Sequence, residues 1–120
     1  MEKYPTLRWI AHHCGAMIPF LTARIAPQPL QDGEVMKLTQ SPVEYFRKIY
    51  ADTVLGGNTA SMMCGYAFFG ADHMLFGTDY PYPGDAAHEA IIEAIGRMEI
   101  TAEEKAKIFS KNAKQLLKLA

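Results

Sequence analysis

Three short apolar segments alternate with helix-like segments along this chain, and this order constrains the fold more than any other feature. The predicted strands are residues 7–11, 49–55 and 74–77, and the predicted helices are residues 16–25, a short stretch from 41, 59–69, a stretch around 91–98 and a final one from 101. Strands that alternate with helices are typical of parallel βαβ units. We therefore predict an α/β fold built on three parallel strands.

Local signals mark where several of these helices begin and end. Ser41 and Thr101 are each followed three residues later by a glutamate, which is the capping-box pattern of a helix start. Gly70 suits the C-terminal end of the helix before it. Residues 26–40 lack any regular pattern and are predicted as a long loop. Apolar spacing predicts that the final helix buries Phe109, Ala113, Leu116 and Leu117.

Composition and charge exclude several classes of partner. The 120 residues are 49% hydrophobic and 21% charged, which suits one compact domain over residues 1–120. Twelve basic and thirteen acidic residues leave a net charge of -1, so we expect neither nucleic acid nor an anionic membrane surface as a partner. Two cysteines and an N-terminus without a secretory pattern predict a cytoplasmic protein with free thiols.

Polar side chains stand where each predicted strand ends. His12 and His13 follow the first strand, Asp52 lies in the second, and Asp79 follows the third within the run Phe76–Pro81. The carboxyl ends of parallel strands meet at one edge of a sheet, which is where α/β proteins place their chemistry. Imidazole and carboxylate together suit zinc or a similar divalent ion, whose bound water can ionise near neutral pH.

Each of these residues also has a purely structural interpretation. Asp79 could accept hydrogen bonds from the amides of the turn before Pro81. A strand-end histidine is more often a hydrogen-bonded structural residue than a ligand. For Asp52 we favour the bonding of neighbouring backbone amides, and for Cys14 a small buried thiol over a soft metal ligand. His73 precedes its strand, so it should lie at the opposite end of the sheet.

The motifs at these strand ends resemble those of the amidohydrolase-related superfamily. The segment from His13 to Phe20 is similar to the "His-x-Gly-Gly-x-x-Pro" segment of the branch that includes aminocarboxymuconate semialdehyde decarboxylase and γ-resorcylate decarboxylase. Residues 50–53 and 75–81 resemble the next strand and the final barrel strand of that branch, and residues 112–117 its closing helix. The resemblance covers essentially the whole chain. It implies that the chain is the C-terminal (β/α)3 portion of a TIM-type (β/α)8 barrel.

The resemblance also implies roles for two residues. Asp79 matches the eighth-strand aspartate, a metal ligand that also handles a proton of the bound water. His13 matches the sixth-strand histidine, which is a metal ligand or a catalytic acid or base depending on the member. We prefer His13 to His12 because Pro19 then falls at the family's distance from the histidine. The implied cofactor of the complete enzyme is a divalent metal, with zinc as the first expectation.

Part of the family's site has no counterpart in these residues. The family's first-strand metal ligands and its fifth-strand histidine are absent, and a complete barrel needs roughly 250 residues. We therefore expect a fragment of a metal-dependent decarboxylase or hydrolase of small carboxylated or aromatic acids that is inactive alone. The remaining ligands would come from a complementing N-terminal half. The competing hypothesis is a non-catalytic, homo-oligomeric or partner-binding relic.

Overall fold

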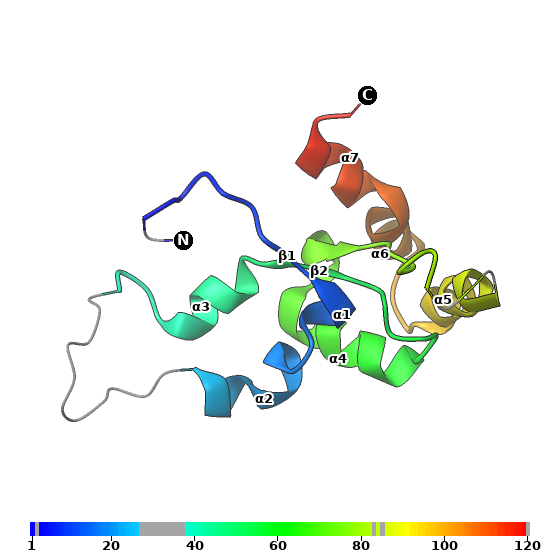
Figure 1. The fold of residues 1–120 in the computed structure, drawn as a ribbon, viewed down its shortest axis with the longest axis horizontal. Coiled ribbons are helices and arrows are strands. Elements are labelled where there is room, and N and C mark those ends of the chain that lie inside the picture. The colour runs from blue at the N-terminus through cyan, green and yellow to red at the C-terminus, as the bar shows by residue number, and fades with distance from the viewer. Residues whose placement is uncertain (2, 27–37, 83, 85, 120) are drawn as a thin grey trace.

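Three parallel strands form the centre of the molecule in this computed structural model, which describes residues 1, 3–26, 38–82, 84 and 86–119 (Figure 1). The strands are β1 (Ile10–Ala11), β2 (Tyr50–Asp52) and β3 (Met74–Leu75). They lie in the order β1-β2-β3, and both pairings are parallel. The predicted α/β fold with three parallel strands is confirmed.

Helices follow each strand and gather on two sides of this small sheet. Figure 1 shows α2 and α3 on one side of the strands and α5 to α7 on the other. The helical elements are α1 (His12–Gly15), α2 (Ile18–Ile25), α3 (Pro42–Arg47), α4 (Thr59–Phe69), the 3-10 turn η1 (Ala71–His73), α5 (Ala86–Arg97), α6 (Ala102–Ala106), the π-helical turn η2 (Lys107–Lys111) and α7 (Asn112–Leu117).

The predicted helix starts and stops are present. Ser41 Oγ accepts a hydrogen bond from the Glu44 amide at the start of α3. At the start of α6, Thr101 and Glu104 form the complete reciprocal capping box. Gly70 ends α4 with a φ of 73°, a left-handed value that glycine adopts without strain. Most of the predicted loop 26–40 lies outside the described residues.

The hydrophobic core lies between the sheet, α4, α5 and η2. Its largest fully buried apolar side chains are Met62, Met74, Ile91, Ile95 and Ile108. They come from four elements that are distant in sequence. The core therefore packs β3 against α4, which precedes it, and against α5 and η2, which follow it. This core holds the carboxyl ends of β2 and β3 in fixed positions.

Two burial predictions were wrong. The predicted first strand was expected to be buried, but Trp9 is 48% and Leu7 51% exposed because β1 is an edge strand and none of the described residues pairs with its outer side. In the final helix Phe109 and Leu117 are exposed, whereas Ile108 and Asn112 are buried. The π-helical turn η2 adds a residue to one helical turn and so rotates the buried face away from a regular 3.6-residue repeat. None of the described helices is long and apolar enough to cross a membrane.

Candidate active site at the carboxyl ends of the strands

Strand register brings the polar strand-end residues together. Ala11 pairs with Ala51, so His12 and Asp52 are the next residues on neighbouring strands. Asp52 pairs with Leu75 of β3, and Asp79 follows four residues later. In both β1 and β2, an alanine is therefore followed by a polar residue at this edge of the sheet. The sheet places all three side chains at one edge, as expected for parallel strands.

The segment after β3 lies unusually close to β2. Thr53 Oγ1 donates to the Gly77 carbonyl at 3.0 Å and accepts from the Gly77 amide at 3.1 Å. A Cβ atom at Gly77 would lie only 3.1 Å from the Cβ of Asp52. Glycine at this position thus permits the close approach that directs the following residues, including Asp79, toward β2.

A left-handed turn follows β1 and changes the direction of its side chains. His13 and Cys14 have φ values of 52° and 53°, a region that residues with a Cβ adopt at a cost. In a continuing strand, successive side chains would point to opposite faces. Here the rings of His12 and His13 stack instead, with centroids 4.7 Å apart. Both imidazoles therefore lie on the same side of the turn.

Asp52 is the buried anchor of the site, with 7% of its surface exposed. Its Oδ1 accepts hydrogen bonds from the amides of Cys14 at 3.1 Å and Val54 at 3.0 Å. The favoured structural interpretation of Asp52, that it bonds backbone amides, is confirmed. Its Oδ2 also contacts His12 Nδ1, a pairing that the sequence interpretation missed. Asp52 thus fixes both the turn after β1 and the orientation of the His12 ring.

Asp79 lies beside His12 rather than His13. The Nε2 atom of His12 is 3.3 Å from Asp79 Oδ1, and Asp79 itself adopts a left-handed φ of 63°. The pKa of His12 is raised above its usual value, first because Nδ1 bonds to Asp52, then through the negative charge of Asp52 and, to a smaller extent, of Asp79. Asp52, His12 and Asp79 therefore form a continuous carboxylate–imidazole–carboxylate chain.

His13 lies next to this chain and faces a hollow. Its Nδ1 is 3.2 Å from the carbonyl oxygen of Val54, so the ring donates there and leaves Nε2 as an acceptor. Together with Thr78 and Asp79 from the segment after β3, His13 lines a hollow of about 400 Å³. Both sequence-predicted residues, His13 and Asp79, thus border the same space. Their assignment as metal-binding or catalytic residues stays a prediction.

Cys14 takes no part in this chemistry. It is 3% exposed, and burial, with smaller contributions from Asp52 and Cys64, raises the pKa of its thiol to about 12. A thiol with such a pKa stays protonated near neutral pH and is a poor metal ligand. Its Sγ packs so closely on α4 that a Cβ at Gly65 would lie 2.1 Å from it. The interpretation of Cys14 as a small buried thiol is confirmed.

The donor atoms at this edge suit a divalent cation but do not complete a site. His12 Nε2 and Asp79 Oδ1 are an imidazole nitrogen and a carboxylate oxygen, which zinc and manganese both accept. Within the part of the chain that the structure describes, no group of three or more His, Cys, Asp or Glu residues could hold a metal ion. The described residues thus fit part of a metal coordination shell.

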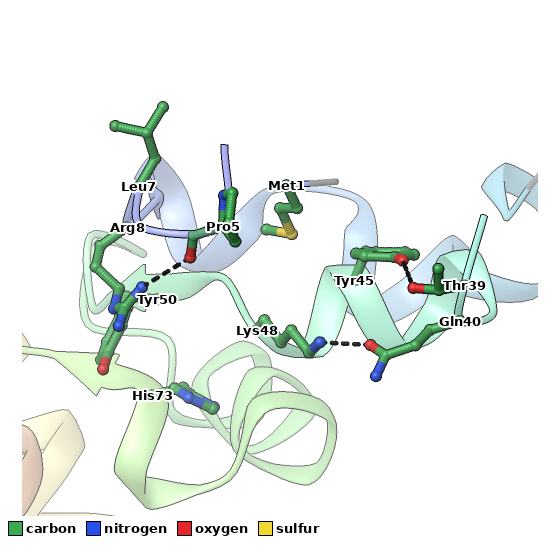
Figure 2. Close-up of a pocket in the computed structure, with 10 residues that line it drawn as sticks. All are labelled: Met1, Pro5, Leu7, Arg8, Thr39, Gln40, Tyr45, Lys48, Tyr50 and His73. Carbon is green, nitrogen blue, oxygen red and sulfur yellow. Dashed lines mark hydrogen bonds between the residues drawn. The ribbon is translucent and has the colours of Figure 1, made fainter. Parts of the chain in front are cut away.

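Another hollow lies at the amino ends of the strands (Figure 2). It measures about 500 Å³ and is bordered by Arg8, Lys48, Tyr50 and His73 among others. His73 packs edge-on against Tyr50, at the end of the sheet opposite Asp79, as the sequence predicts. Arg8 and Lys48 bond to neutral acceptors, the Pro5 carbonyl and the Gln40 amide oxygen, as Figure 2 shows. This end holds no acid–base chain like that of His12 and Asp52 among the described residues.

The pairing of His12 with Asp52 carried a signal in the sequence. The first predicted strand ends at Ala11 before His12, and the second contains Ala51 before Asp52, so aligning those alanines places His12 opposite Asp52. The left-handed turn at His13 and Cys14 could not be predicted from the sequence. Of its residues, only Gly15 is of a type that favours a positive φ.

Comparisons with known proteins agree with this architecture. The amidohydrolase family model matches residues 1–119. The chain is 31% identical over 100 residues to a 6-methylsalicylic acid decarboxylase of Penicillium expansum, and 32% identical over 105 residues to the decarboxylase MacB of Penicillium terrestre. Each match covers 82% of this chain, but only 30% and 29% of the respective relative.

Solved structures give the same result at the level of the fold. The 5-carboxyvanillate decarboxylase of Sphingomonas paucimobilis superposes with a TM-score of 0.84 at 25% identity over 99% of this chain and 36% of its own. A dihydroxybenzoic acid decarboxylase of Polaromonas, solved with manganese and the inhibitor 2-nitroresorcinol, superposes with a TM-score of 0.79 at 28% identity over 98% of this chain and 35% of its own. The three-stranded unit corresponds to part of a (β/α)8 barrel. The chain therefore belongs to the amidohydrolase family and spans about a third of the length of these relatives.

Proposed function

We propose that this chain supplies part of the active site of a metal-dependent decarboxylase that acts on small aromatic carboxylic acids. The observation that carries the proposal is the meeting of His12, His13 and Asp79 at the carboxyl ends of parallel strands. Family membership supports the same site, and two curated relatives are decarboxylases. On this view residues 1–120 form a single C-terminal barrel segment.

Decarboxylation without a redox step requires few groups. The bond between the ring carbon and the carboxyl carbon breaks, CO2 leaves, and the electron pair stays on the ring carbon, which takes up a proton. His13 lines the hollow beside Asp79, where its Nε2 can take up a proton from solvent and donate it to that carbon. Val54, whose carbonyl accepts from Nδ1, keeps the imidazole oriented toward the hollow. Leu55 and Ile91 line the same hollow and supply apolar contacts for an aromatic ring.

A divalent cation, when bound, would neutralise and orient the substrate's carboxylate. Asp79 is the residue of this chain that we assign to it first, because its carboxylate lies at the strand edge with 36% of the side chain exposed. We expected zinc from the sequence, whereas the Polaromonas relative holds manganese, so both ions belong in any test. Of the two roles that the sequence suggested for His13, we propose the catalytic acid or base and not the metal ligand.

Exposed apolar side chains and unpaired strand edges support association with another polypeptide. Trp9, Ile10 and Phe20 are 48%, 56% and 80% exposed, and β1 and β3 each leave one side unpaired among the described residues. Unpaired strand edges and large apolar side chains favour a covering partner. We propose that the remaining barrel strands, or a second copy of this chain, cover these side chains and strand edges. Sedimentation of the purified chain as a stable monomer at micromolar concentration would contradict this.

The proposed function can be tested by supplying the missing part of the barrel. The chain would be joined to, or co-expressed with, the N-terminal barrel segment of the Penicillium expansum relative, and CO2 release would be measured on a panel of hydroxylated aromatic acids with zinc or manganese. We expect activity from the pair and none from either part alone. A folded, metal-loaded pair that releases no CO2 from any member of the panel would favour the non-catalytic relic that binds a partner.

A further inference from the structure

We propose that the hollow at the amino ends of the strands is a binding site for a small organic carboxylate with an apolar body, held first by Arg8 and second by Lys48. Its volume of about 500 Å³ lies within the range of small-molecule sites. It lies at the end of the sheet opposite His12 and Asp79, so the inference goes beyond the proposed function and does not depend on it.

Each of the three strands brings one residue to this hollow. Arg8 precedes β1 by two residues, Tyr50 is the first residue of β2, and His73 comes directly before β3. The Tyr50 amide donates to the Trp9 carbonyl at 2.8 Å, which fixes the start of β2 next to the segment that carries Arg8. The side chains from three separate parts of the sequence therefore border one space, as Figure 2 shows.

Arg8 offers the first contact for a carboxylate. Its Nη1 donates to the carbonyls of Pro5 and Thr6, both at 3.4 Å, so its Nε and Nη2 have no partner among the described residues. Nε and Nη2 lie on one edge of the guanidinium, and two such parallel donors match the two oxygens of a carboxylate. Neutral carbonyls thus orient Arg8 and leave a donor pair for a ligand.

Lys48 is a second cation held by neutral groups. Its Nζ donates to the side-chain oxygen of Gln40 and lies over the ring of Tyr45, 5.3 Å from the ring centroid. An ammonium group has three donors. Lys48 therefore keeps its full charge and further donors at the border of the hollow.

No described carboxylate neutralises these two cations. None of the described residues that line the hollow is acidic. Two acids that neighbour lining residues in the sequence pair elsewhere, Glu44 with Arg47 at 3.2 Å and Asp72 with Lys107 at 2.7 Å. Two permanent cations without a countercharge attract an anion. The charge of the hollow thus favours an anionic ligand over a neutral one.

The rest of the lining favours a ligand with an apolar part. Pro5 and Leu7 border the hollow, as do Tyr50 and His73, whose rings meet edge-on with centroids 5.0 Å apart (Figure 2). An inorganic anion would leave these surfaces in water, whereas a hydrocarbon or aromatic body covers them. The lining therefore favours an organic carboxylate over phosphate or sulfate.

The decisive experiment titrates the unmodified, 15N-labelled 120-residue chain with benzoate, with benzyl alcohol as its uncharged match, and with inorganic phosphate. We expect benzoate to shift the backbone amides of Arg8, Tyr50 and His73 saturably, benzyl alcohol to leave them unchanged, and phosphate to bind more weakly than benzoate. Benzoate shifts confined to His12 and Asp79, an equal response to benzyl alcohol, or tighter binding of phosphate would overturn the proposal.

Substitutions separate a specific site from general attraction of an anion to surface cations. R8Q should lower benzoate affinity about 10-fold or more, because hydrogen bonds to a charged group are lost, and K48Q should lower it about 2–5-fold, as for an exposed charge. R24Q removes the same charge from an exposed position in α2 outside the hollow and should leave the affinity unchanged.

Circular dichroism of each variant verifies that it folds. Equal losses of benzoate affinity in R8Q and R24Q would overturn the proposal. This result is independent of the catalytic test, because a completed barrel that releases no CO2 ends the proposed function and leaves the amino-end site in place.

Discussion

The two ends of the three strands differ in what their polar residues do. At the carboxyl ends, His12, Asp52 and Asp79 form a chain of acid–base groups, of which Asp52 also holds the turn after β1. At the amino ends, the buried Asn112 donates through Nδ2 to the carbonyls of Ala71 at 2.6 Å and Met74 at 2.8 Å and so ties α7 to the start of β3. The hollow at the amino ends is the larger one, about 500 Å³ against about 400 Å³. Volume alone therefore does not locate the chemistry in this molecule.

The comparison predicts that changes at the carboxyl ends affect activity and changes at the amino ends affect stability. This division agrees with the general pattern of βα-barrels, where catalysis uses the carboxyl ends of the strands and the opposite end maintains the fold. Substitutions at each end test the division directly.

The largest effect should follow substitution of Asp79. In the completed barrel, D79N removes the carboxylate charge that we assign to the metal, and we expect CO2 release to fall by about 10²–10⁴-fold. Because Asp79 is partly exposed and lies outside the core, the unfolding free energy of the chain should change little. The matched change H73Q at the opposite end should leave the rate of CO2 release intact. A D79N barrel as active as its parent would break the comparison.

Removal of the Asn112 side chain should have the reverse effect. N112A leaves the carbonyls of Ala71 and Met74 without their buried donor, and we expect a loss of about 1–3 kcal/mol in the free energy of unfolding. Urea denaturation followed by circular dichroism measures it, with the exposed neighbour Gln115 changed to alanine as the control. CO2 release by the completed barrel should stay as in the parent. A drop in CO2 release without loss of stability would show that the two ends are not separate.

Two glycine-to-alanine substitutions test how closely the residues behind the site are packed. G65A forces a Cβ to within 2.1 Å of Cys14 Sγ, and overpacking of this kind costs about 1–3 kcal/mol. G96A in α5 meets no atom within 4 Å and should stabilise the helix by about 0.5–1 kcal/mol. Thermal unfolding of both variants gives the comparison. Equal stability of the two variants would contradict the close packing of Cys14 on Gly65.

The smallest effect concerns pH and lies away from both ends. The Tyr66 hydroxyl donates to Glu104, and this bond, with those from Thr101, lowers the pKa of Glu104 to about 2. A carboxyl whose pKa is lowered on folding stabilises the protein above its unfolded pKa of about 4.3, and that contribution is lost as pH falls toward 2. We expect Y66F to be slightly less stable than the parent chain at pH 7, and this difference to shrink as pH falls from the unfolded pKa through about 2. Urea titrations across this range measure it, and a difference that stays constant over the range would rule out the ionised Glu104 as its source.

The sequence allowed the parallel order of strands to be predicted, and also the meeting of polar residues at their carboxyl ends, because both follow from local pattern and chain topology. Burial of Trp9 and Phe109 was predicted wrongly for two different reasons. Apolar character says that a residue favours contact, but not whether a neighbouring strand exists to cover it. A π-helical turn changes the repeat on which a helical face is predicted.

The candidate site was predictable to the level of the strand edge but not to the level of the side chain. From the sequence, Asp52 was predicted to bond only backbone amides, and its contact with His12 was not predicted. The stacking of the two imidazoles accompanies a left-handed turn at His13 and Cys14. Such a turn is decided by packing of Cys14 and Gly15 against α4, which is tertiary information.

The metal dependence of CO2 release by the completed barrel tests the central claim most directly. The preparation is stripped with a chelator, assayed, and assayed again after addition of zinc or manganese. We predict no release from the stripped pair, recovery with at least one of the two ions, and no recovery when the chain carries D79N. Release that persists after stripping, or recovery in D79N equal to that of the parent, would contradict a metal site at the carboxyl ends of these strands.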